Sequence, residues 1–336
     1  MPGDLPADPQ SLAVSLCPLL REQSDGRLSP VEWFRAAWQR GGAATGFATW
    51  TQDNQPPIPV VLKLPVGPVE YRWTSCLGAT PHDQWNSAQA RATPTPRVIA
   101  QGTALGGFDL AWLIMERLPG RPLTQHLEPQ CIHDLLIAAC DFHTSAVAIA
   151  PPDEHSISPD WEATIGKARE IVRAGGIPEA QKWNEAIHRV QKALPTLRTR
   201  WEARPHNVWC HGDLHPGNAL RRDDPPPGSP TDRHGCVLID LALVHAGHWI
   251  EDALYLERQF WGYPEVLDGI KPVSVLARLR RERGLPVDDD YPRLSLIRRV
   301  LAASCAPALV EREGNPRYLH AALHNIEQYL PQAMSS

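Results

Sequence analysis

The part of the sequence with the most chemical content is the loop His211–Asn218, which reads HGDLHPGN. Glycine and proline residues enforce a compact turn there between two short apolar runs, and the loop presents the carboxylate of Asp213 and the carboxamide of Asn218. A further carboxylate, Asp240, ends the apolar run 237–239. A buried strand that ends in an unpaired charge is costly, and a hard divalent cation held by Asn218 and Asp240 oxygens would compensate this charge. Asp213 would then be available to orient or deprotonate a hydroxyl group.

The elements that must position these residues change in character near residue 118. Up to that point, short apolar runs between turn residues predict strands, for example at Phe47–Gln52 and Pro59–Leu64. Beyond it, helical periodicity dominates, and the strongest helix signal is Ile132–Ala148. The fold class predicted from this order is α+β, with a small β-rich N-terminal part and a larger, mainly helical C-terminal part.

Three segments follow from this change along the chain. Residues 1–30 are rich in Pro, Ser and Asp, which predicts a loose N-terminal lead-in. The β-rich part spans residues 31–118, and the helical part spans residues 119–336. At the start of the β-rich part, Val31–Arg40 spaces its aromatic residues at helical intervals and therefore predicts a helix.

Charge and composition exclude several classes of protein. The 336 residues include 33 Lys and Arg against 38 Asp and Glu, a net charge of −5, which excludes a globally basic binder of nucleic acid or membrane surfaces. Apolar residues make up 43% of the chain, enough for a sizeable core. We therefore expect no nucleic-acid partner and no membrane, and the sequence indicates no protein partner.

Cysteine usage and the N-terminal sequence predict a cytoplasmic protein. The seven cysteines are scattered without a CxxC pair, which argues against a disulfide framework or a zinc ribbon. The N-terminal residues lack the basic segment and apolar run of a secretion signal. The strongly apolar runs are also shorter than the roughly 20 residues of a membrane-spanning helix.

The loop and the apolar run that follows it resemble a known family. HGDLHPGN with VLID downstream is similar to the aminoglycoside phosphotransferase, choline kinase and fructosamine kinase family, which shares the protein-kinase-like fold. The family pattern continues here with Gly247, seven residues after Asp240, and with Asp252, five residues further. The resemblance implies a two-lobed fold, in which residues 31–118 form the nucleotide-binding N-lobe. Residues 119–336 would form the C-lobe, with the catalytic loop and the acceptor-binding helices.

The same resemblance implies a role for each residue of the loop motif. Asp213 would be the catalytic aspartate that contacts the hydroxyl group of the acceptor. Asn218 and Asp240 would hold magnesium that bridges the ATP phosphates. His211 would brace the loop, and Asp252 would tie the loop to a helix through backbone N–H groups. The resemblance therefore implies ATP and Mg2+ as cofactors and a small hydroxylated molecule as the acceptor.

The N-terminal part offers matching residues. Lys63 lies within an apolar strand, an expensive place for an ammonium group unless it is paired. The resemblance implies that Lys63 contacts the α- and β-phosphates and that Glu70, at the start of the next helix, holds it. The segment LIMERLPG resembles the hinge strand of the family, in which the backbone around three residues would hydrogen-bond adenine. These residues are Met115, Glu116 and Arg117.

A glycine cluster precedes the first long strand of this part. Gly41, Gly42 and Gly46 would allow the backbone to approach the phosphates of the nucleotide closely. The family has a strand immediately before such a cluster, whereas Val31–Arg40 predicts a helix.

The function predicted is ATP- and Mg-dependent transfer of a phosphoryl group to a hydroxyl of a small molecule, such as an aminoglycoside, sugar, amino-sugar or amino-alcohol. A catalytically silent kinase-like protein, acting as a binding or regulatory module, is the alternative of a different class. A protein kinase is a further alternative, although Asp240 begins an Asp-Leu-Ala sequence rather than Asp-Phe-Gly. A zinc or iron hydrolase would use Asp213 and Asp240 together with the histidines of the two motifs, which are His211, His215, His245 and His248.

The acceptor is not specified by these motifs. Carboxylates after the catalytic loop could bind a cationic acceptor, and they are Glu251, Glu257 and the cluster 288–290. Two tryptophans, Trp249 and Trp261, could stack on a sugar ring.

Overall fold

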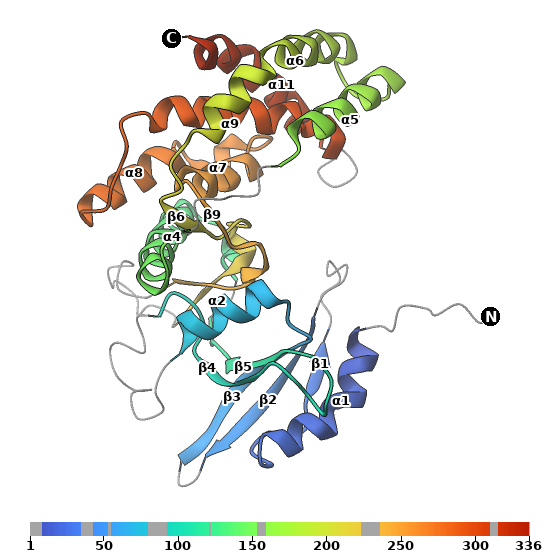
Figure 1. The fold of residues 1–336 in the computed structure, drawn as a ribbon, viewed down its shortest axis with the longest axis vertical. Helices are drawn as coiled ribbons and strands as arrows, with labels where there is room; N and C mark the ends of the chain where they lie inside the picture. The colour runs from blue at the N-terminus through green and yellow to red at the C-terminus, as the bar shows by residue number, and fades with distance from the viewer. Residues whose placement is uncertain are drawn as a thin grey trace, which may run out of the picture. The chain divides into compact units, whose positions relative to one another are not determined.

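The computed structural model describes residues 9–34, 43–52, 55–79, 93–120, 122–152, 159–222, 236–309 and 315–335. It divides into two compact units, whose elements are labelled in Figure 1. Unit 1 comprises Met1–Leu123 and Gly217–Val244, and unit 2 comprises Thr124–Pro216 and His245–Ser336. Strands dominate unit 1 and helices dominate unit 2, so the predicted α+β class is confirmed.

Unit 1 is built on a five-stranded antiparallel sheet with the order β1-β2-β3-β5-β4. Its strands are β1 (Glu32–Phe34), β2 (Ala44–Gln52), β3 (Gln55–Leu64), β4 (Val98–Gly102) and β5 (Trp112–Glu116). The long hairpin β2–β3 pairs Thr45 with Lys63, and β3 pairs Lys63 with Leu113 of β5. Lys63 therefore lies on the central strand of the sheet.

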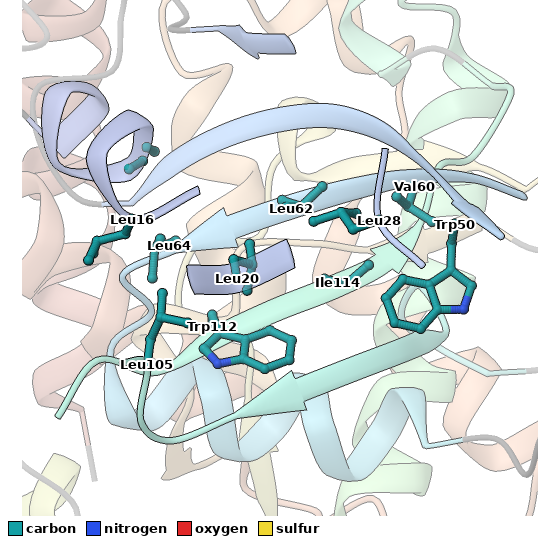
Figure 2. Close-up of a cluster of buried hydrophobic side chains, with 12 residues drawn as sticks. Leu16, Leu20, Leu28, Trp50, Val60, Leu62, Leu64, Leu105, Trp112 and Ile114 are labelled. Atoms are coloured by element: carbon teal, nitrogen blue, oxygen red, sulfur yellow. The ribbon is translucent and has the colours of Figure 1, made fainter. Parts of the chain in front are cut away.

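The two faces of the sheet follow from the alternation of side chains along β3. Val60, Leu62 and Leu64 are at most 1% exposed and belong to the larger core of unit 1. Lys63 lies between two of them and points to the opposite face, because successive side chains of a strand alternate. Figure 2 shows the core on the first face, to which several elements contribute residues including Leu16, Leu20, Leu28, Trp112 and Ile114.

The N-terminal segment contains a helix, α1 (Pro9–Gln23). The structure differs from the expected loose lead-in over residues 1–30, because α1 contributes Leu16 and Leu20, and the segment after it contributes Leu28, to the core of unit 1. The prediction was wrong because it relied on the high content of Pro, Ser and Asp, whereas the apolar residues are spaced as in an amphipathic helix whose apolar side packs on the sheet.

The segment after α1 also differs from the sequence prediction. Glu32–Phe34 forms strand β1 rather than part of a helix, and it pairs with β2 through Glu32 and Phe47. Residues 35–42, which include Gly41 and Gly42, lie outside the described residues. Gly46 lies within β2, where an added Cβ would contact the side chain of Val31. Pairing with a neighbouring strand, which periodicity does not report, decided between the helix and the strand.

The opposite face of the sheet carries helix α2 (Pro68–Gly78). Pro68 occupies the first turn of α2, where the missing N–H has no helical partner anyway, and Glu70 follows in the same turn. Trp73 and Leu77 of this helix are buried. A second, smaller core cluster of unit 1 combines Val66, Val98 and Leu113.

Residues 217–244 belong to unit 1 as well, whereas the sequence placed them in the C-terminal part. Strands β7 (Ala219–Arg221) and β8 (Cys236–Leu238) form an antiparallel pair. This pair is fastened to the rest of unit 1 by a bridge between Pro122 and Leu220 and by the Leu238 N–H, which donates to the Pro94 carbonyl at 2.9 Å. Short 3-10 turns flank the pair at Pro216–Asn218 and Leu241–Leu243. A boundary drawn along the chain misses such long-range pairing.

Unit 2 is mainly helical. Its helices are α4 (Pro129–Ile149), α5 (Trp161–Ala174), α6 (Ala180–Glu202), α7 (Ile250–Gln259), α8 (Pro272–Glu282), α9 (Tyr291–Ser304) and α11 (Pro316–Met334), with 3-10 turns at Pro264–Leu267 and Ala306–Leu309. A further 3-10 turn, Leu123–His126, begins at the unit boundary. A two-stranded sheet joins β6 (Val208–Cys210) to β9 (His245–Gly247). Helices α6, α9 and α11 pack against one another, and Trp183 and Trp201 of α6 are completely buried.

Helix α4 is long and apolar enough to cross a membrane by length and composition alone. Eleven of its 21 residues are buried, however, and the buried set includes the polar side chains of Asp134 and His143. His143 forms a buried hydrogen bond to Asp252 of α7. These contacts are those of a core helix of a folded unit.

Candidate active site

Lys63 and Glu70 form an ion pair in unit 1. Only 17% of the Lys63 side chain and 8% of the Glu70 side chain are exposed. Burial would lower the pKa of Lys63, but the charges of Glu70 and Asp240 outweigh it and raise that pKa, so Lys63 remains an ammonium ion. Burial raises the pKa of the Glu70 carboxyl, and the neighbouring Lys63 opposes this shift. The turn from β3 into α2 thus pairs Lys63 with Glu70 on the face of the sheet opposite α1.

Asn218 and Asp240 are brought together by the β7–β8 pair. The register Ala219↔Leu238 sets Asn218, just before β7, beside the residues that follow β8. The Ile239 N–H accordingly donates to the Asn218 carbonyl at 2.9 Å. Two residues with oxygen-bearing side chains, separated by a long stretch of sequence, thereby lie at the same end of the β7–β8 pair.

Asp240 also reaches Lys63, because Lys63 Nζ lies 3.3 Å from Asp240 Oδ1. The backbone of Asp240 adopts the left-handed conformation, with φ 63° and ψ 65°. This conformation is uncommon outside glycine and clusters at functional sites. Its side chain is 48% exposed, so the carboxylate is accessible to a ligand. The carboxylate of Asp240 and the amide oxygen of Asn218 are the hard oxygen donors that Mg2+ prefers, and the donor set therefore fits magnesium.

The loop that contains Asp213 lies in unit 2 and is fixed by Asp252 of α7. Asp252 accepts hydrogen bonds from the backbone N–H groups of His211, at 2.8 Å, and Gly212, at 3.0 Å. Gly212 has φ 82°, a conformation that glycine adopts without strain and that lets two successive N–H groups converge on one carboxylate. The carboxylate of Asp252 is 1% exposed. The loop backbone is therefore locked to α7.

His143 completes the environment of Asp252, with Nε2 2.9 Å from Oδ2 of Asp252. Burial would raise the pKa of the Asp252 carboxyl, but the hydrogen bond from His143 and the N–H of Gly212 contribute to lowering it. Burial lowers the pKa of His143. The pair is therefore an ionised Asp252 that accepts a hydrogen bond from the protonated Nε2 of a neutral His143.

Asp213 itself contacts α7 through a residue that the sequence did not single out. The Tyr255 hydroxyl donates a hydrogen bond to Asp213 Oδ1. His215 Nε2 lies 3.7 Å from Asp213 Oδ2, and the Asp213 N–H donates to His211 Nδ1 at 3.2 Å. The signal available in the sequence was the spacing of three residues between Asp252 and Tyr255, which places both side chains on one side of a helix.

The segment predicted to read adenine is more engaged than the sequence suggested. The N–H of Glu116 donates to the Arg97 carbonyl, and the N–H of Arg117 donates to the Pro59 carbonyl, both at 2.9 Å. The Glu116 carboxylate is buried and binds the guanidinium groups of Arg97 and Arg222. These two N–H groups are thus used within unit 1, and an adenine would have to be read by carbonyls of the segment or by backbone groups beyond Arg117.

The carboxylates proposed for a cationic acceptor are largely held inside unit 2. Both oxygens of Glu257 accept from Arg299, each at 2.7 Å. Glu251 accepts from Arg204 at 2.9 Å, and Asp288 Oδ1 lies 2.8 Å from His248 Nε2. Three of the five carboxylates thus have internal partners.

The zinc or iron alternative finds no suitable ligand set among the described residues. One group of potential ligands, Cys210, His245 and Glu251, has its atoms within 4.8 Å of one another. Burial raises the pKa of the Cys210 thiol well above its usual value, and the nearby carboxylates of α7 add to this shift. The thiol points to the His248 carbonyl at 3.4 Å, and Glu251 already binds Arg204. Because the Arg204 guanidinium already binds the Glu251 carboxylate, this carboxylate is a poor ligand for a further cation.

The two tryptophans proposed for stacking on an acceptor are internal. Trp249 is fully buried, and its Nε1 lies 3.3 Å from Asp288 Oδ1. Trp261 is 9% exposed and stacks on Tyr318 with ring centroids 5.8 Å apart. Both side chains therefore belong to the interior of unit 2.

The predicted site residues fall into two groups, one in each unit. Unit 1 contains Lys63, Glu70, Asn218 and Asp240 as well as the segment 115–117, while Gly41 and Gly42 lie outside the described residues. Unit 2 contains His211, Asp213 and Asp252. The chain passes from unit 2 to unit 1 between Pro216 and Gly217, so the HGDLHPGN motif supplies residues to both groups.

Comparison with known proteins adds a family and a fold. A sequence model described as the phosphotransferase enzyme family matches residues 83–297, which is more than half of the chain. A search of curated proteins by sequence finds no match.

Two of the solved structures that match illustrate the likeness of fold over nearly the whole chain. A candidate aminoglycoside phosphotransferase from Ralstonia eutropha JMP134 matches with a TM-score of 0.55 at 14% identity, over 95% of this chain and 99% of that chain. A microcompartment-associated aminopropanol kinase matches with a TM-score of 0.60 at 13% identity, over 96% and 98%. At such identities the likeness concerns the fold, and it confirms the kinase-like fold expected from the sequence.

Proposed function

Because the chain belongs to the phosphotransferase enzyme family, we propose that it transfers the γ-phosphoryl group of ATP, with magnesium, to a hydroxyl group of a small molecule. The observation that carries this proposal is the arrangement in unit 1, where Lys63 Nζ pairs with Glu70 and lies 3.3 Å from Asp240 Oδ1. A buried ammonium ion beside an accessible carboxylate is the combination that binding of a nucleotide phosphate and a metal ion requires.

In this proposal, Lys63 binds the phosphates of ATP and Glu70 keeps the ammonium group in place. Asn218 and Asp240 hold magnesium, which when bound neutralises negative charge on the phosphates. The Lys63–Asp240 contact supports this division of roles, because the two side chains would then face the same group of phosphate oxygens. The adenine would be read near Met115 by backbone groups other than the N–H groups of Glu116 and Arg117.

Asp213 orients the hydroxyl group of the acceptor and takes its proton. The acceptor oxygen forms a bond to the γ-phosphorus while the bond between that phosphorus and the oxygen of ADP breaks. Little covalent chemistry is asked of the protein, so the rate depends on the placement of Asp213 and on charge neutralisation. His211 and Asp252 support the loop, as their hydrogen bonds indicate.

For the acceptor, we favour a small hydroxyl compound of low charge, such as a sugar, amino-sugar or amino-alcohol, over a polycation. Glu251, Glu257 and Asp288 are engaged by arginine or histidine, which removes them as partners for a polycation. The aminopropanol kinase among the similar structures is consistent with an amino-alcohol. The proposal includes a cytoplasmic location and no macromolecular partner.

The test is release of ADP from MgATP in the presence of a panel that contains neutral sugars, amino-sugars, amino-alcohols and aminoglycosides. We expect turnover with at least one low-charge compound, and we expect Asp213→Asn to lower it by about 10²- to 10⁴-fold, the usual contribution of a general base. Asp160→Asn is the matched control, because Asp160 caps helix α5 at the surface.

Two results would contradict the proposal. One is near-wild-type turnover by a folded Asp213→Asn variant. The other is a wild-type protein that neither releases ADP with any compound nor changes its melting temperature on addition of MgATP, which would support the silent, kinase-like binding protein instead.

A further inference from the structure

Tyr255 is the side chain of α7 that reaches the predicted catalytic aspartate. Its hydroxyl donates a hydrogen bond to Asp213 Oδ1. An ionised carboxylate has no proton to donate, so the phenol is the donor and Asp213 the acceptor. Neither the loop motif nor the family resemblance assigns Tyr255 a role.

The position of Tyr255 on α7 connects it to the anchor of the loop. Asp252, three residues earlier on the same side of the helix, holds the backbone N–H groups of His211 and Gly212. Helix α7 therefore holds the loop at two points. Asp252 binds the backbone of the loop, and Tyr255 binds the side chain of Asp213. The two contacts together specify both the path of the loop and the direction of the carboxylate.

The phenol ring is held in place by further contacts of α7. The guanidinium carbon of Arg258 lies 5.1 Å from the centroid of the Tyr255 ring. Glu257, between them in sequence, is bound at both oxygens by Arg299 of α9, which fixes this turn of the helix. A donor carried by a restrained ring holds its acceptor better than one carried by a flexible chain.

We propose that Tyr255 is a positioning residue that sets the orientation of the Asp213 carboxylate toward the hydroxyl group of the acceptor. Rotation of an aspartate carboxylate about its last torsion is only weakly restricted by the side chain itself. A hydrogen bond to Oδ1 sets the plane of the carboxylate, and with it the direction in which Oδ2 meets an incoming hydroxyl. This inference rests on the proposed function, because it takes Asp213 to be the residue that contacts the hydroxyl group of the acceptor.

The test compares Tyr255→Phe with the wild type, using MgATP and the acceptor found in the ADP-release panel. Phenylalanine keeps the ring and its contact with Arg258 and removes only the hydroxyl group. We expect kcat to fall by about 10- to 100-fold, the usual effect of a misplaced catalytic group, while KM for MgATP stays within about twofold. Tyr263→Phe is the matched control, because the Tyr263 hydroxyl accepts from Asn315 at 2.6 Å and has no part in the proposed site.

A second measurement asks whether Tyr255 acts through Asp213. In an Asp213→Asn background, Tyr255→Phe should change the residual rate by less than about twofold, because the group that Tyr255 positions has already been altered. In the wild-type background, the acid limb of the kcat/KM profile should move to higher pH, because a carboxylate that loses a donor is protonated more readily. The other titratable or charged groups near Asp213 and Tyr255 are His211, His215 and Arg258, and they are the same in the wild type and in Tyr255→Phe.

The outcomes separate this inference from the proposed function. A wild-type protein without phosphotransfer overturns both, whereas an active wild type with an unchanged Tyr255→Phe variant overturns the role of Tyr255 alone. Equal losses in the wild-type and Asp213→Asn backgrounds would indicate a general structural effect and also overturn it. Should Tyr255→Phe lose its helical circular dichroism signal, Tyr255→His replaces it as the test. This variant keeps a ring N–H donor, and lower turnover than in Tyr263→Phe without a shift of the acid limb would contradict the inference.

Discussion

Replacing Asp252 by asparagine should destabilise unit 2 strongly although the two side chains have nearly the same shape. Asp252 is 1% exposed and is the common acceptor for three donors. Its Oδ2 lies 2.8 Å from the His211 nitrogen and 2.9 Å from His143 Nε2, and its Oδ1 lies 3.0 Å from the Gly212 nitrogen. Asparagine has one acceptor oxygen and one NH2 group, so it cannot serve all three donors.

The magnitude follows from these three contacts. With its oxygen in the place of Oδ2, the substituted asparagine would keep two bonds, but each falls from about 1.5–3 kcal/mol for a charged acceptor to about 1 kcal/mol for a neutral one. Its NH2 group would then face the N–H of Gly212 and leave a buried donor unsatisfied, at about 1–3 kcal/mol. The sum is about 2–7 kcal/mol, which is at least about thirtyfold in the unfolding equilibrium constant.

Urea unfolding followed by far-ultraviolet circular dichroism measures this loss, because the helices of unit 2 dominate the signal. Asp160→Asn is the control, since Asp160 accepts from the Ala163 N–H at 2.9 Å at the exposed start of α5, where asparagine caps equally well. We expect a change below about 0.5 kcal/mol in the control. If Asp252→Asn is no more destabilising than Asp160→Asn, the assignment of Asp252 as an ionised anchor of the loop is refuted.

The remaining predictions concern pH and backbone packing. Burial would raise the pKa of Glu251, but His245 and two arginines outweigh it and hold that pKa well below its usual value. The ionised Glu251 therefore stabilises the folded protein above about pH 4, the pKa of a glutamate in the unfolded chain. This stabilisation is lost as the pH falls through the lower pKa of the folded protein. Glu251→Gln should lower the melting temperature at pH 7 and make it less dependent on pH below about 4, and an unchanged acid slope would argue against the assignment. Gly120→Ala should destabilise unit 1 by about 1–3 kcal/mol, because an added Cβ would contact the Arg221 carbonyl oxygen. Gly166→Ala, in the middle of α5 with open space around it, should instead stabilise unit 2 by about 0.5–1 kcal/mol. In thermal unfolding, the melting temperature should therefore fall for Gly120→Ala and rise for Gly166→Ala.

The sequence by itself predicted the residues of a candidate site and, correctly, the class of the fold. A carboxylate and a carboxamide on a tight Gly-Pro loop and a further carboxylate after an apolar run pointed to Asp213, Asn218 and Asp240. The family that this motif resembles then pointed to Lys63. The change from strand-like to helical periodicity near residue 118 also predicted the α+β class. Such information is local in the chain, because it depends on composition and on spacing within a few residues.

Pairing between distant segments was decided only by the tertiary structure. The N-terminal segment became a core helix and strand β1 because a sheet was present to pack and pair with, and residues 217–244 joined unit 1 through β7 and β8. The contacts of Lys63 with Asp240 and of Tyr255 with Asp213 likewise join segments that are far apart in sequence. Helical and strand periodicities report which side of an element is apolar, but they carry no information about which distant element meets it. For this reason the residues of the predicted site could be named from the sequence, while their contacts with distant side chains, that of Tyr255 with Asp213 among them, required the tertiary structure.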